Sequence, residues 1–162
     1  MRGLTNVFAH LDGSPPPRDA DAARPRLVGL DGGNADAAAR NRLRLGIADD
    51  NDGIRAMLTA VFSLEPDFEI VGEAANGAQA LELAERDGLD LLLLDLSMPE
   101  LDGLEVLERL SSSRPDLPVV VYTGMTGDGV ERRAQSLGAR DVVLKGVPPT
   151  ELVDRLRAAG SR

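Results

Sequence analysis

Residues 91–103 read Leu-Leu-Leu-Leu-Asp-Leu-Ser-Met-Pro-Glu-Leu-Asp-Gly, and the architecture expected for the chain follows from this stretch. The four leucines form an apolar run that is too short for a buried helix and is typical of a strand covered on both faces of a parallel sheet. Asp95 follows the last leucine directly, and Pro99 and Gly103 then turn the chain. We therefore expect the Asp95 carboxylate at the carboxyl end of a central strand, where ligands bind in open α/β sheets.

The composition narrows the class of protein. A chain of 162 residues with 43% hydrophobic content fits one domain with a real core, with or without a tail. It contains no cysteine, which excludes disulfides and thiolate metal sites. A formal net charge of -9 argues against direct nucleic-acid binding. No stretch predicts membrane insertion and no secretory signal is evident, so we expect a cytoplasmic protein.

The chain divides into two parts. Residues 1–42 are rich in Pro, Ala, Asp and Arg and show no sustained period, which predicts a disordered N-terminal tail. Residues 43–160 alternate short apolar runs with stripes of helical spacing, such as Ile54, Met57, Leu58, Val61 and Phe62. This second part is the predicted folded domain.

Five strands are predicted, and each is followed by a helix. They are expected at 43–48, 68–71, 91–94, 119–123 and 141–144. Short parallel connections require right-handed helical crossovers, so the predicted fold is α/β, a flavodoxin-like doubly wound parallel sheet with helices on both faces. The most apolar runs belong in its middle, which predicts the strand order 2-1-3-4-5. Asn51 or Asp52 is expected to cap the first helix, and Asn76 the second.

Polar side chains follow four of the five predicted strands. Asp49 and Asp50 follow the first, Asp95 the third, Thr123 ends the fourth, and Lys145, the one lysine of the sequence, follows the fifth. Three carboxylates at one edge of the sheet would repel one another unless a cation neutralised them, and Mg²⁺ suits oxygen ligands of this kind. A hydroxyl and an ammonium beside them could bind phosphoryl oxygens and leave a carboxylate as the nucleophile.

Taken together, Asp49-Asp50, residues 95–103, Thr123-Gly124 and Lys145 resemble the receiver domain of bacterial two-component response regulators. The resemblance is strongest to the subgroup that often carries a helix-turn-helix output domain. It implies a phosphoacceptor signalling protein rather than a turnover enzyme, although such a protein takes part in its own phosphorylation and dephosphorylation.

The resemblance also implies roles for individual residues and partners. Asp95 would accept the phosphoryl group from a sensor histidine kinase or a phosphotransfer protein, and Thr123 and Lys145 would bind that group. Asp49, Asp50, Asp95 and the carbonyl of Ser97 would hold Mg²⁺. The face formed by the fourth helix, fifth strand and fifth helix would then change, and so act on a downstream protein or drive self-association.

Two features depart from the family pattern. Val142 stands where the family usually has an aromatic residue, so the usual aromatic switch is missing. No helix-turn-helix domain follows the last predicted helix, which indicates a single-domain regulator or a fragment.

Two other classes stay open at the level of the sequence. Asp50-Asn51-Asp52 with Thr123 and Lys145 faintly resembles the haloacid dehalogenase phosphatases, but that interpretation leaves residues 95–103 unexplained. A receiver-like scaffold that works without phosphorylation is the second alternative.

Overall fold

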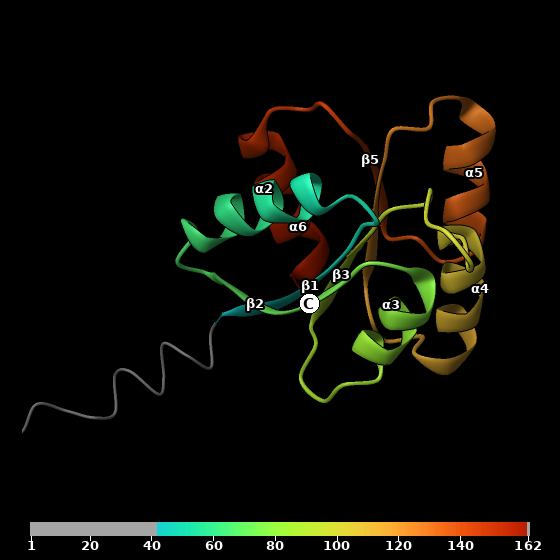
Figure 1. Cartoon of the computed structure of the whole chain (residues 1–162), viewed down its shortest axis with the longest axis horizontal. Helices are drawn as coiled ribbons and strands as arrows, with labels where there is room; N and C mark the ends of the chain where they lie inside the picture. The colour runs from blue at the N-terminus through green and yellow to red at the C-terminus, as the bar shows by residue number, and fades with distance from the viewer. Residues whose placement is uncertain (1–41, 162) are drawn as a thin grey trace, which may run out of the picture. The chain divides into compact units, whose positions relative to one another are not determined.

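Five parallel strands form one sheet in the order β2-β1-β3-β4-β5, which confirms the predicted topology (Figure 1). This computed structural model describes residues 42–161, so all of the predicted tail except residue 42 lies outside the described residues. The elements follow one another as β1 (Leu43–Ala48), α2 (Asp52–Ser63), β2 (Phe68–Ala74), α3 (Gly77–Ala84), β3 (Leu91–Leu94), α4 (Gly103–Ser113), β4 (Val119–Thr123), α5 (Asp128–Ser136), β5 (Asp141–Leu144) and α6 (Pro149–Gly160).

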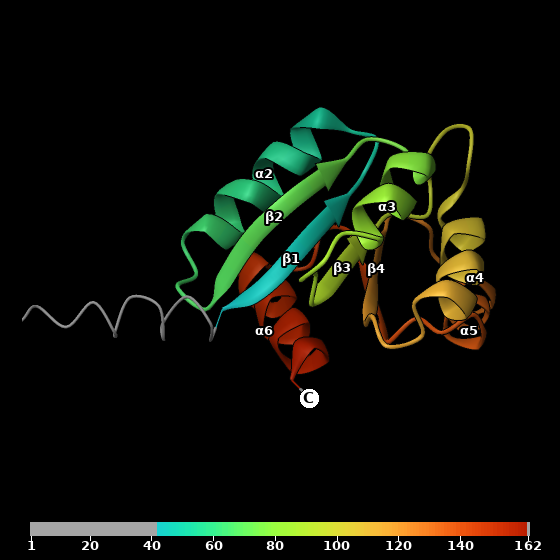
Figure 2. The same ribbon diagram turned by 90° about the horizontal axis from the view of Figure 1, so that it is seen from below.

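The helices cover both faces of the sheet, α2 and α6 on one and α3, α4 and α5 on the other (Figure 2). Because side chains alternate along a strand, β3 contributes to both layers of the core. Leu91 and Leu93 pack in the layer with α2 and α6, whereas Leu92 and Leu94 pack in the other layer. All four leucines are buried, as expected for a strand covered on both faces.

The strand register brings the carboxyl ends of the strands into line. Ala48 pairs with Leu94, Leu94 with Val121, and Thr123 with Leu144. The residues that follow these positions therefore meet at one edge of the sheet.

Side-chain caps start three of the helices. Asn51 caps α2 by accepting a hydrogen bond from the Ile54 backbone N–H, and Asn76 caps α3, as the sequence predicts. In α4, Asp102 and Glu105 form a reciprocal capping box. Side-chain contacts thus fix the starts of α2, α3 and α4, whereas α5 and α6 begin without a side-chain cap.

One residue of the predicted apolar stripe differs from expectation. Met57 is 41% exposed, while Leu58 and Phe62 of the same stripe are fully buried. Met57 lies at the margin of the stripe and borders an apolar groove between α2 and the start of α6, so the sheet does not cover it.

Within residues 42–161, no helix combines the length and the apolar composition that crossing a membrane requires.

Candidate functional site

Asp49 and Asp95 directly follow β1 and β3, which are neighbouring inner strands of the sheet. The Asp95 backbone N–H donates to the carbonyl of Ala48 (2.8 Å), and that of Asp49 donates to Ala74 (3.1 Å), so both residues are held by the extended ladder. Asp49 is 1% exposed and Asp95 is 2% exposed. Buried carboxylates of this kind need a compensating partner.

Lys145 supplies that partner. Its backbone N–H donates to the carbonyl of Thr123 (2.8 Å), which fixes the start of the side chain at the same edge of the sheet. The Lys145 Nζ lies 2.7 Å from Asp49 Oδ2 and 2.8 Å from Asp95 Oδ2. Burial acts to lower the pKa of Lys145, but the hydrogen bonds and charges of Asp49 and Asp95 outweigh it and raise that pKa above its ordinary value. The ammonium therefore stays charged between the two acids.

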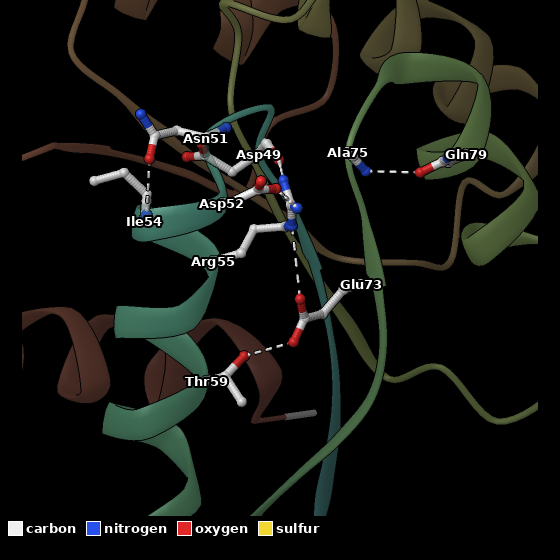
Figure 3. A network of polar contacts seen from close by, with 9 residues as sticks. All are labelled: Asp49, Asn51, Asp52, Ile54, Arg55, Thr59, Glu73, Ala75 and Gln79. Atoms are coloured by element: carbon white, nitrogen blue, oxygen red, sulfur yellow. Dashed lines mark hydrogen bonds and ion pairs between the residues drawn. The ribbon is translucent and has the colours of Figure 1, made fainter.

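A third carboxylate lies beside this pair. One carboxylate oxygen from each of Asp49, Asp50 and Asp95 falls within 4.8 Å of the others. Asp50 is exposed, and among the described residues its side chain has no hydrogen bond or ion pair. The Asp49 Oδ1 accepts a hydrogen bond from the Asn51 backbone N–H (2.9 Å), which fixes the turn into α2 (Figure 3).

Thr123 completes the group at the end of β4. It is fully buried, and its Oγ1 accepts a hydrogen bond from the Met125 backbone N–H (3.1 Å). The hydroxyl hydrogen remains available as a donor, and the contact joins the site to the segment that follows β4.

The loop from Asp95 to Gly103 depends on a close backbone approach. A Cβ at position 103 would overlap the Asp95 carbonyl oxygen and would lie 2.6 Å from the Leu96 Cα. The Gly103 N–H also donates to the Leu96 carbonyl (3.0 Å). Ser97 lies within this loop and is exposed.

The structure therefore brings together the side chains of Asp49, Asp50, Asp95 and Lys145, with Thr123 at the adjacent strand end and Ser97 in the loop after Asp95. It also shows a contact that sequence reasoning missed. The Arg55 Nη1 donates to the carbonyl oxygen of Asp49 (2.6 Å). One signal was present: Arg55 is the only basic residue of α2 and lies near its N-terminus, where a cation is unfavourable.

The donor set fits a hard divalent cation. Asp95 Oδ1 is buried and has no hydrogen-bond partner within residues 42–161, and two further carboxylates lie close to it. Mg²⁺ prefers oxygen ligands and commonly uses one or two carboxylates together with water and phosphate. The chemistry of these residues therefore suits Mg²⁺ and a phosphoryl group at one place.

Comparison with known proteins identifies the class. The family model of the response regulator receiver domain matches residues 45–157, and the chain belongs to that family. A receiver domain of the response regulator NarL from Mycobacterium tuberculosis has a similar structure, with a TM-score of 0.71 at 31% identity over 75% of this chain and 99% of that one.

Two curated relatives match the same part of the chain. The uncharacterized transcriptional regulatory protein YhcZ of Bacillus subtilis is 36% identical over 118 residues, which cover 73% of this chain and 55% of YhcZ. A protein-glutamate methylesterase/protein-glutamine glutaminase of Methylobacillus flagellatus is 43% identical over 101 residues, or 61% of this chain and 28% of that protein. The chain thus spans about half or less of the length of these relatives, and the similarity concerns the receiver part.

The family favours neither alternative left open by the sequence. The receiver family accounts for residues 95–103, which the haloacid dehalogenase interpretation leaves unexplained. The three acids and the lysine lie together, an arrangement that a scaffold working without phosphorylation would not need.

Proposed function

We propose that this receiver domain, residues 43–160, is phosphorylated on Asp95 with the help of Mg²⁺. The observation that carries the proposal is the buried Asp95 carboxylate, whose Oδ2 contacts Lys145 and whose Oδ1 has no hydrogen-bond partner among the described residues. A carboxylate oxygen of Asp95 would attack phosphorus and form the new O–P bond, while the bond from phosphorus to the donor breaks; the atom that leaves with its electron pair is a histidine nitrogen in a kinase or phosphotransfer protein and an oxygen in acetyl phosphate.

The neighbouring residues have complementary roles in this proposal. Asp49, Asp50, Asp95 and the backbone carbonyl of Ser97 would hold Mg²⁺, which neutralises phosphoryl oxygens when it is bound. The Lys145 ammonium would turn from the carboxylates to a phosphoryl oxygen, and the Thr123 hydroxyl would donate to another.

The receiver family supports a proposal about the partners. Receiver domains exchange phosphoryl groups with histidine kinases and phosphotransfer proteins, and we propose such a donor for this chain. We further propose that phosphorylation alters the face formed by α5, β5 and α6, which then binds a downstream protein or a second copy. The role is that of a cytoplasmic signalling phosphoacceptor rather than a turnover enzyme, without direct nucleic-acid binding by residues 43–160.

The test is phosphorylation by radiolabelled acetyl phosphate in the presence of Mg²⁺. Asp95→Asn keeps the size of the side chain but removes its nucleophilicity, so it should abolish labelling while the circular dichroism spectrum stays unchanged. Excess chelator should stop labelling of the unaltered protein.

Asp116→Asn is the matched control, since Asp116 is exposed and precedes β4 at the opposite end of the sheet. It should label normally. Labelling that persists in Asp95→Asn would place the acceptor elsewhere, and full labelling in chelator would exclude the metal.

A further inference from the structure

Arg55 joins three elements next to Asp49 (Figure 3). Its Nη1 donates to the main-chain carbonyl of Asp49 at the end of β1 (2.6 Å). Its Nη2 pairs with Asp52 in the first turn of α2, and its Nε lies 3.6 Å from Glu73 Oε2 on β2. The side chain is only 13% exposed, so the guanidinium is packed within the protein at this position.

Glu73 anchors the other side of the network. It pairs with Ile47 in the sheet register, and its Oε1 accepts a hydrogen bond from the Thr59 hydroxyl (2.8 Å). The Arg55 guanidinium is therefore held by Glu73 of β2 and Asp52 of α2 as well as by the Asp49 carbonyl. A planar guanidinium with several fixed donors can serve three oxygens at once, which a single ammonium does less well.

The Asp49 carbonyl belongs to the peptide unit that leads into Asp50. Because a peptide unit is planar, fixing this oxygen also fixes the direction in which the chain enters Asp50. The Asp50 side chain has no hydrogen bond or ion pair of its own among residues 42–161, so its orientation depends on the backbone. The hydrogen bond from the Asn51 backbone N–H to Asp49 Oδ1 also stabilises this turn.

We infer that Arg55 is a positioning residue for the metal site: by holding the Asp49 carbonyl it keeps the Asp50 carboxylate directed toward Asp49 and Asp95. The inference rests on the proposed function, because it assumes that these three acids hold Mg²⁺. It assigns Arg55 no contact with the ion or with the phosphoryl group. Its charge is already offset by Asp52 and Glu73.

The sign of the effect separates positioning from simple electrostatics. A cation near three acids repels Mg²⁺, so on charge alone the loss of Arg55 would tighten Mg²⁺ binding. If Arg55 instead positions the acids, its loss weakens binding. Loss of a partner that orients metal ligands typically lowers metal affinity by about 10- to 100-fold.

The experiment is calorimetric titration of Mg²⁺ into the full chain and its variants in the absence of any phosphoryl donor. Arg55→Gln should weaken Mg²⁺ binding by about 10-fold. Arg55→Lys keeps the charge but loses the planar fork, and it should also bind Mg²⁺ more weakly than the unaltered protein. Wild-type or tighter binding in either variant would overturn the inference.

Arg157→Gln is the matched control. Arg157 also bridges three acids: Glu65 and Asp67, which precede β2 at the amino end of the sheet, and Asp154, which lies with Arg157 in α6. This variant removes an arginine with the same number of acidic partners and should bind Mg²⁺ with unchanged affinity. An equal loss of Mg²⁺ affinity in Arg157→Gln would show a general effect of stability and would contradict the inference.

Phosphorylation kinetics give a second readout. Because Asp95 itself is untouched, Arg55→Gln should need more Mg²⁺ for half-maximal labelling but should approach the normal rate at saturation. A rate that stays low at saturating Mg²⁺ would argue against a positioning role. If the unaltered protein bound no Mg²⁺ at all, the proposed function itself would fail, which is a different result.

Discussion

At the scale of single residues, the state of the site is set by one ammonium between two buried carboxylates. Lys145 forms ion pairs with both Asp49 and Asp95 but offsets only one of their two negative charges, and removing the ammonium would leave both buried carboxylates uncompensated. A phosphoryl group on Asp95 would offer new anionic oxygens to the same ammonium. Lys145 is thus placed to distinguish the unmodified from the phosphorylated acid.

We predict that Lys145→Arg separates phosphorylation from the structural response. The variant keeps the positive charge, and Asp95 and the metal ligands remain, so labelling by acetyl phosphate should persist. The larger planar group cannot place one donor where Nζ lies, so the change in amide hydrogen exchange caused by beryllofluoride should be reduced. An undiminished response would mean that any cation suffices at this position.

The sequence predicted that most of these side chains lie at one edge of the sheet, because each ends or follows an apolar run in a parallel sheet. Strand ends and strand order are enough to predict the positions of Asp49, Asp95, Thr123 and Lys145. The strand register then brings these residues together. Arg55 could not be found in this way. Its bond to the Asp49 carbonyl depends on the angle at which α2 leaves β1, which periodicity does not report.

At the scale of elements, the loop between β3 and α4 is shaped by two glycines. A Cβ at Gly77, the first residue of α3, would overlap the Leu101 carbonyl oxygen, and one at Gly103 would overlap that of Asp95. The N-terminus of α3 and that of α4 therefore both press against this loop. The sequence predicts only that Gly103 is a turn residue. The backbone that would clash with a side chain at position 103 is brought there by the tertiary fold, which the local sequence does not report.

We predict that Gly103→Ala lowers the free energy of unfolding by about 1–3 kcal/mol, since the added methyl group forces the backbone at Asp95 to move. The rate of Asp95 labelling should fall as well, because the nucleophile moves with its backbone. Urea unfolding and acetyl phosphate labelling measure the two effects.

Gly129→Ala serves as the control. It lies in α5, and a Cβ there would meet nothing within 4 Å. The free energy of unfolding should stay the same or rise by up to about 1 kcal/mol, and labelling should be normal. If Gly103→Ala behaved like this control, the close approach at Asp95 would have no energetic importance.

At the scale of the whole molecule, strand order and layer arrangement follow from the apolar pattern, but the route by which a signal leaves the site does not. Val142 is buried in β5 and has one stiff torsion, so it cannot swing between buried and exposed positions as an aromatic ring would. The segment after β4 offers another route. A Cβ at Gly124, Gly127 or Gly129 would meet nothing within 4 Å, and Gly127 has a φ of 127°. Thr123 Oγ1 holds this segment through Met125.

We predict that occupation of the site orders residues 124–130 and shifts α5 by a change of population. Movement of the Thr123 hydroxyl toward a phosphoryl oxygen would carry the Met125 backbone with it. Amide hydrogen exchange with and without beryllofluoride and Mg²⁺ should show increased protection mainly across residues 124–130. A response centred on Val142, with this segment unchanged, would contradict the prediction.

Because Lys145 is the one lysine of the sequence, the site can be labelled selectively. Apart from the terminal amine, the sequence offers an amine-directed reagent one target, and that target lies between Asp49 and Asp95. Reductive methylation with isotopically labelled formaldehyde would therefore place a single side-chain probe at the site. The chemical shift of this probe would report whether the amine still contacts Asp49 and Asp95 or instead contacts a bound phosphoryl mimic.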